Sequence, residues 1–182
     1  MSSKFLDGIM SSFHNPLNPL TLLLLIMILI FSFNTKIKTK FLNKALYQKK
    51  ITSISILITI LLSAVISDQT GRALKNLELR ERPWVNQIES DLNCVVCKVN
   101  DQNQFIGGGR NKSFPSNHAA NAFALAFVIS FFFPKAKKIL YGMAIVIMYS
   151  RVHIGVHYPL DVISGMILGL FVGFISTKLF LF

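Results

Sequence analysis

The sequence has few of the residues that build metal and redox sites. Among 182 residues there are only two cysteines, Cys94 and Cys97, in a Cys-x-x-Cys arrangement. Zinc needs further ligands, and a thioredoxin-like redox site needs a βαβ setting that this region lacks. The eight acidic residues form no cluster suited to a metal ion. We therefore expect no metal and no cofactor, and a local disulfide is the default interpretation of the cysteines on an oxidising face.

Acidic residues are scarce as well as dispersed, and this scarcity is uneven along the chain. Nineteen Lys and Arg stand against eight Asp and Glu, for a formal net charge of +11. The lysine-rich segments 36–50 and 135–138, and the surroundings of Lys178, contain no acidic residue. This pattern is typical of a membrane protein whose basic connections stay in the cytoplasm. Membrane topology explains the positive net charge better than a nucleic-acid-binding surface does.

Apolar residues make up 52% of the chain and gather in blocks instead of repeating with the period of a soluble fold. The blocks are of about the length needed to cross a bilayer, roughly 17 to 25 residues, or slightly shorter. We expect an all-α, polytopic membrane bundle that forms one domain over residues 1–182, with five spans and possibly a sixth. The five expected spans are 17–34, 51–67, 118–133, 139–153 and 160–180.

The N-terminal residues 1–16 lack the cleavage site of a signal peptide. The spacing of Phe5, Ile9, Met10 and Phe13 predicts a short amphipathic helix lying in the membrane interface. With the lysine-rich segments inside, five spans place the N-terminus outside and the C-terminus in the cytoplasm. The loop 68–117 then lies on the outer face, which is periplasmic in a bacterial inner membrane.

Three segments on this outer face carry residues suited to phosphate chemistry. Lys75 and Arg82 are seven residues apart, so a continuing helix brings them to one side. Ser116, as a helix N-cap, leaves free N–H groups beside His118. The third segment reads Ser150-Arg151-x5-His157-x3-Asp161. Each is weak evidence alone, because interfacial basic residues usually snorkel and a His near an Asp is more often a structural pair.

Together the three segments resemble the signature of the type 2 phosphatidic acid phosphatase superfamily of integral membrane lipid phosphatases. The matching residues are Lys75-x6-Arg82-Pro83, Pro115-Ser116-Asn117-His118 and Ser150-Arg151-x5-His157-x3-Asp161. The sequence departs from the family at Asn117, where Gly is usual, and in having two spans instead of three before the first motif. Soluble vanadium haloperoxidases share the signature, but five apolar spans disfavour them.

The resemblance implies a role for each matching residue. His157 is the expected nucleophile, Asp161 orients its ring, and His118 is the expected general acid and base. The expected phosphate-binding residues are Lys75, Arg82, Arg151, Ser116 and Asn117. Gly165, Gly169 and Gly173 form a small-residue stripe that predicts close helix packing, which brings the starts of two spans, and with them His118 and Asp161, together.

We therefore expect a lipid phosphatase whose partners are the bilayer and a membrane lipid phosphate, with no nucleic acid and no obligate protein partner. Undecaprenyl diphosphate and the 1-phosphate of lipid A are the favoured substrates, and phosphatidylglycerol phosphate is a third. A phosphotransferase that passes the phosphate to an alcohol is an alternative. A lipid or anion transporter is an alternative of another class, which requires basic residues to continue toward mid-span.

Overall fold

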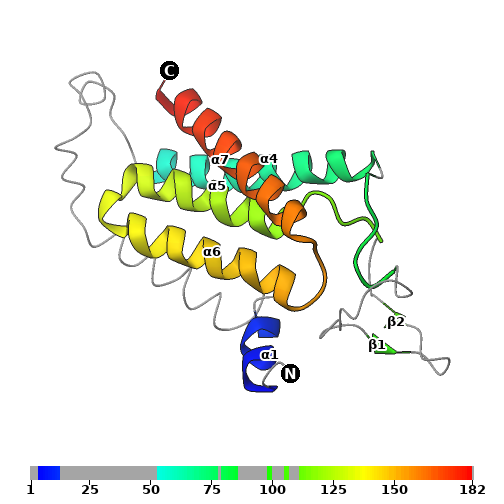
Figure 1. The fold of residues 1–182 in the computed structure, drawn as a ribbon. Helices are drawn as coiled ribbons and strands as arrows, with labels where there is room; N and C mark the ends of the chain where they lie inside the picture. The colour runs from blue at the N-terminus through cyan, green and yellow to red at the C-terminus, as the bar shows by residue number, and fades with distance from the viewer. Residues whose placement is uncertain are drawn as a thin grey trace.

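The computed structural model describes residues 4–12, 53–77, 79–85, 98–99, 105–106 and 111–181. The described part is mainly helical, as expected, with one small pair of strands and the non-helical segments 79–85 and 111–116 (Figure 1). Its elements in chain order are α1 (Lys4–Ser12), α4 (Ser53–Lys75), β1 (Lys98–Val99), β2 (Phe105–Ile106), α5 (Asn117–Phe132), the 3-10 turn η1 (Pro134–Ala136), α6 (Lys137–His153) and α7 (Pro159–Leu181). The strands β1 and β2 pair antiparallel, a feature that the sequence analysis did not predict.

Three of the expected spans are helices whose ends lie within two residues of the predicted boundaries, namely α5, α6 and α7. The helix predicted over 51–67 continues instead to Lys75 as α4. An ion pair of 2.7 Å between Asp68 and Arg72, one helical turn apart, supports this extension. The span predicted at 17–34, the lysine-rich segment 36–50 and the two cysteines lie outside the described residues.

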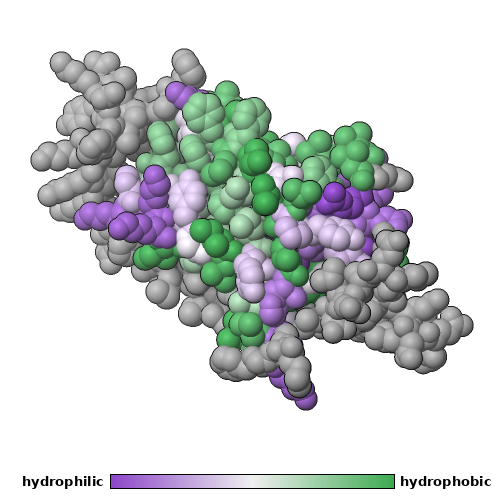
Figure 2. Space-filling view, in the orientation of Figure 1, coloured by the Kyte–Doolittle hydropathy of each residue, from purple (hydrophilic) through white to green (hydrophobic). Residues whose placement is uncertain are grey.

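The outer surface of the long helices is strongly apolar. Within the described part, α4 and α7 contain stretches long and apolar enough to cross a membrane, Ser55–Lys75 and Pro159–Phe180, and α5 is a shorter apolar helix. Leu61 and Val65 of α4 are each 56% exposed, and Ile167 of α7 is 60% exposed. Figure 2 shows this apolar surface across the middle of one face, with polar residues to either side. Exposed apolar area of this extent suits contact with lipid.

The close contact of α5 with α7 depends on the predicted glycine stripe. The backbone oxygens of α5 lie so near α7 that a Cβ at Gly165 would be 2.4 Å from the oxygen of Ser116, and one at Gly169 would be 2.1 Å from that of Ala120. The backbone N–H of Ser116 also donates to the carbonyl of Asp161 at 3.0 Å. The beginnings of the two helices are therefore joined, as expected.

The N-terminal helix α1 packs beside the end of α6 that leads into α7 (Figure 1). Asp7 of α1 contacts the ring Nε2 of His153 at 3.0 Å. Met10 packs against a small core formed by Trp84, Ile154 and Val156. Trp84 is 7% exposed, so it supports the turn after α6 from within the protein.

Replacing Gly169 by Ala is expected to destabilise the bundle, because the new methyl group meets the backbone of α5 and forces the helices apart. Overpacking of this kind costs about 1 to 3 kcal/mol. Gly142→Ala is the matched control, since a Cβ there has no atom within 4 Å. The measurement is the midpoint of thermal unfolding in detergent. Equal midpoints for the two variants would contradict the proposed role of the stripe.

Candidate active site

The turn between α6 and α7 presents His157. Gly155 has a φ of 74°, a conformation that favours glycine, and it lets the chain reverse directly after α6. The backbone N–H groups of Val156 and His157 both donate to the carbonyl of Arg151, each at 3.2 Å. His157 is thereby fixed beside the last turn of α6, where it is 4% exposed.

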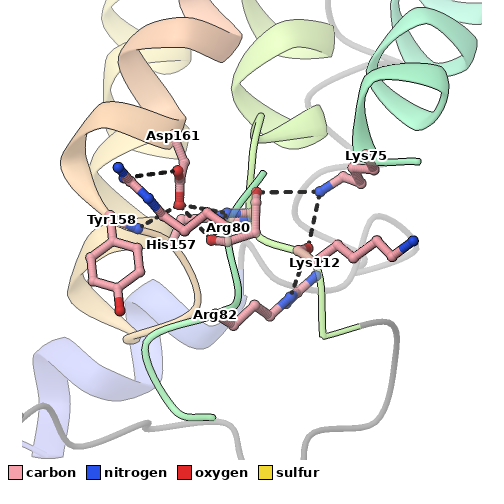
Figure 3. Close-up of polar contacts among 8 residues, drawn as sticks. Lys75, Arg80, Arg82, Lys112, His157, Tyr158 and Asp161 are labelled. Carbon is pink, nitrogen blue, oxygen red and sulfur yellow. Dashed lines mark hydrogen bonds and ion pairs between the residues drawn. The ribbon is translucent and has the colours of Figure 1, made fainter. Parts of the chain in front are cut away.

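The carboxylate of Asp161, in the first turn of α7, is fully buried and lies close to His157 (Figure 3). Its Oδ2 accepts the backbone N–H of Tyr158 at 2.9 Å and the hydroxyl of Ser113. The ring Nδ1 of His157 is 3.7 Å from Oδ2, beyond hydrogen-bond range, but 3.2 Å from the Ser113 hydroxyl oxygen. The other carboxylate oxygen, Oδ1, is 3.5 Å from a guanidinium nitrogen of Arg80.

A short antiparallel pairing carries further groups to this carboxylate. The N–H of Arg82 donates to the carbonyl of Asn111, and the N–H of Ser113 donates to that of Arg80, each at 2.8 Å. The pairing continues through a bridge between Glu81 and Lys112. The chain is therefore extended here, so Arg82 reaches the site along a strand-like segment and not along a continuation of α4.

Lys75 and Arg82, which the sequence predicted to share one side, do meet. Both donate to the carbonyl of Lys112, Lys75 through Nζ at 3.5 Å and Arg82 through Nε at 3.4 Å (Figure 3). Lys75 also reaches the carbonyl of Ser113 at 3.4 Å. These contacts hold two cations from distant parts of the chain within one small region.

The positive charge around His157 is dense. Arg82 repels the charges of both Lys75 and Arg151, and Arg151 is only 1% exposed. Burial lowers the pKa of Arg82, while Asp161 raises it. Burial also lowers the pKa of His157 from 6.5 to about 4, and the charges of Arg82 and Lys75 act in the same direction against the opposing effect of Asp161. The ring of His157 is thus neutral near pH 7.

The beginning of α5 faces the same region. Ser116 is its N-cap residue, but its hydroxyl makes no capping hydrogen bond; it is fully buried and has no hydrogen-bond partner within the described part of the chain. His118 lies half-buried in the first turn. The side chain of Asn117 turns away from this site, because its amide donates to the backbone and side-chain oxygens of Asp68 at 3.1 and 3.0 Å. Asn117 can therefore meet a ligand only through its backbone N–H.

Sequence reasoning missed two residues of this site, Ser113 and Arg80. Ser113 stands only three residues before the expected N-cap and gave no separate signal. Arg80 and Arg82 are two residues apart, which places them on one side of an extended chain. A continuing helix was instead predicted for this segment. Arg80 also lies over the ring of Tyr158, 5.2 Å from its centroid.

Among the residues described, no three His, Cys, Asp or Glu side chains gather where they could hold a metal ion. The groups that do gather are a neutral histidine, a buried carboxylate, two buried cations (Lys75 and Arg151), the half-buried cation of Arg82 and a serine hydroxyl at a helix start that makes no capping bond. This set can bind an oxyanion and offer a nucleophile to it.

Comparison with known proteins identifies the family. The sequence pattern of the PAP2 superfamily matches residues 49–182. The chain belongs to the PAP2 superfamily. The candidate site of this chain lies at the end of the bundle where α4 ends and α5 and α7 begin. Two solved structures have the same fold: LpxE of Aquifex aeolicus (TM-score 0.58, 25% identity, 97% of this chain and 88% of that one) and a transmembrane PAP2-type phosphatidylglycerolphosphate phosphatase of Bacillus subtilis (0.57, 23%, 98% and 78%).

Curated relatives resemble parts of the PAP2 chain described here. An undecaprenyl-diphosphatase of Sulfolobus acidocaldarius is 42% identical over 69 residues, which cover 37% of this chain and 33% of that protein. A lipid A 4'-phosphatase of Bacteroides thetaiotaomicron is 36% identical over 129 residues, which cover 67% of this chain and 54% of that protein. The matches thus span between a third and just over half of these relatives.

We expect His157 to become protonated only as the pH falls through about 4, because burial and two neighbouring cations oppose a positive charge on its ring. Arg82→Gln removes one of those cations and should raise the midpoint. The ring can be followed by NMR of histidine-labelled protein in detergent, with its signal assigned by its loss in His157→Ala.

Lys178→Gln, at the far end of α7, is the control for this titration and should leave the midpoint unchanged. A midpoint near 6.5 in the unmodified protein, or no rise in Arg82→Gln, would contradict the electrostatic account of the site.

Proposed function

We propose that this PAP2 protein is a metal-independent phosphatase that removes a phosphate from a membrane lipid through a phosphohistidine intermediate. The observation that carries the proposal is the gathering of Lys75, Arg82 and Arg151 around the neutral ring of His157. Like charges held together at a buried site repel one another unless an anion joins them. A phosphoryl group supplies that charge and also the electrophile that a neutral imidazole attacks.

The reaction has two steps. A ring-nitrogen lone pair of His157 forms a bond to phosphorus while the bond from phosphorus to the leaving oxygen breaks, and His118 gives that oxygen a proton. His118 then accepts a proton from water, whose oxygen attacks phosphorus and breaks the N–P bond. Inorganic phosphate leaves, and the histidines return to their starting states.

The remaining groups hold the phosphoryl oxygens. The three cations, the Ser116 hydroxyl and the N–H groups at the start of α5 stabilise the charge that spreads over these oxygens in the transition state. The Ser116 hydroxyl suits this role because it makes no capping bond. Asn117 contributes through its backbone N–H, since its side chain is bound to α4.

The substrate we propose is undecaprenyl diphosphate or a phosphate of lipid A, with phosphatidylglycerol phosphate as a third candidate. The names of the relatives and of the Bacillus subtilis structure support this set. The site end of an apolar bundle also suits a phosphate whose anchor stays in the bilayer (Figure 2).

We propose further that the site faces the periplasm, with the N-terminus outside and the C-terminus in the cytoplasm. Helix α1 packs near the site end of the bundle, whereas the lysines at 135–138 and Lys178 lie at the other end, which supports this orientation (Figure 1). The charged residues of α5, α6 and α7 lie in terminal turns, which favours an enzyme at the membrane surface over a transporter with a charged pathway.

The test is phosphate release by purified protein in detergent with EDTA, from the three lipids in parallel. We expect release from at least one lipid and a loss of at least a thousandfold in His157→Ala, since the nucleophile is gone. His153→Ala is the matched control, because His153 lies one turn earlier and contacts Asp7 instead of the site. It should keep most of the activity.

The intermediate can be sought directly with a lipid labelled in its terminal phosphate. Label that stays on the protein in alkali, is lost in acid and is missing from His157→Ala indicates phosphohistidine. Transfer of label to an added alcohol instead of water supports the phosphotransferase. No release and no transfer with folded protein, or full activity in His157→Ala, would overturn the proposed function.

A further inference from the structure

We propose that Ser113 is a positioning residue that links Asp161 to His157 and sets which nitrogen of the ring carries the proton. The catalytic role of Ser113 rests on the proposed function, but the contacts from which the tautomer is inferred do not depend on that function. Ser113 is fully buried and stands outside the three motifs that predicted the site.

The contacts of Ser113 place its hydroxyl between the two groups. Its oxygen is 3.2 Å from Nδ1 of His157, and its proton goes to Oδ2 of Asp161. The direct distance from Nδ1 to Oδ2 is 3.7 Å, which is too long for a hydrogen bond. The carboxylate therefore acts on the ring through the serine and not by direct contact.

Counting protons gives the tautomer. A serine hydroxyl has one proton, and an ionised carboxylate can only accept. Because that proton goes to Asp161, the hydroxyl oxygen can only accept from the ring, so Nδ1 of His157 must carry a proton. In the neutral ring the lone pair is then on Nε2, which becomes the attacking atom.

Other contacts hold this arrangement in place. The backbone N–H of Ser113 donates to the carbonyl of Arg80 at 2.8 Å, and Arg80 in turn lies 3.5 Å from Oδ1 of Asp161. The N–H of Tyr158 donates to Oδ2 at 2.9 Å, so the carboxylate is held on both oxygens. When phosphorus bonds to Nε2, the ring becomes positively charged. The carboxylate polarises the Ser113 hydroxyl, and the hydroxyl oxygen in turn stabilises the protonated Nδ1.

The first test is the tautomer itself, which needs no substrate. Histidine-labelled protein in detergent at pH 6.5 is observed by ¹⁵N NMR, with the His157 signals assigned by their loss in His157→Ala. We expect a proton on Nδ1 in the unmodified protein and a mixture of both tautomers in Ser113→Ala. A proton on Nε2 in the unmodified protein, or an unchanged tautomer in Ser113→Ala, would overturn the proposal.

The second test is kinetic, on the lipid that the unmodified protein hydrolyses. Ser113→Ala should lower kcat about tenfold to a hundredfold with little change in KM, since the ring is misplaced but the cations remain. Ser63→Ala is the matched control: Ser63 is equally buried, but its hydroxyl bonds the carbonyl of Ile60 within α4. Equal kcat values for the two variants would refute a role for Ser113.

The two proposals fail in different ways. If no lipid phosphate is hydrolysed, the proposed function fails while the tautomer measurement still decides the role of Ser113. If hydrolysis depends on His157 but not on Ser113, only this further inference fails. Thermal unfolding midpoints of Ser113→Ala and Ser63→Ala should agree, which separates a positioning effect from loss of fold.

Discussion

Burial of the Asp161 carboxylate imposes a requirement that several parts of the fold meet together. A carboxylate removed from water costs several kcal/mol unless donors replace the lost hydration. Here the donors come from three segments: the hydroxyl of Ser113, the N–H of Tyr158 and the guanidinium of Arg80. The pairing of residues 80–82 with residues 111–113 places two of these donors, the Arg80 guanidinium and the Ser113 hydroxyl, beside the carboxylate. The carboxylate thus brings these loops together as well as lying beside His157.

The cations of the site, unlike the Asp161 carboxylate, lie close to groups of the same charge. Arg82 repels both Lys75 and Arg151. Even so, the backbone carbonyl of Lys112 holds Lys75 and Arg82 together, and the last turn of α6 carries Arg151 to the turn that holds His157. Such an arrangement costs folding energy, which the Asp161 carboxylate offsets in part and a bound anion would offset further. Preorganised charge of this kind stabilises a transition state without rearrangement during the reaction.

The sequence predicted what depends on local pattern. The apolar blocks predicted α5, α6 and α7, the glycine stripe predicted the contact of α7 with α5, and the motif residues predicted that His157 and Asp161 lie together. It could not predict Arg80 and Ser113 as partners of Asp161, because those contacts join residues 81 and 48 positions apart. Nor could it tell that Asn117 would turn to Asp68, since only the packing of α4 on α5 makes that bond available.

The hydrogen bond from the Ser116 N–H to the Asp161 carbonyl ties the start of α5 to the start of α7. It joins main chain to main chain, so a side-chain substitution that keeps the backbone N–H leaves this link in place, while the glycine stripe sets how closely the two helices approach. Substitutions of the side chains around the site can then change what the site contacts without breaking this link between the two helix starts.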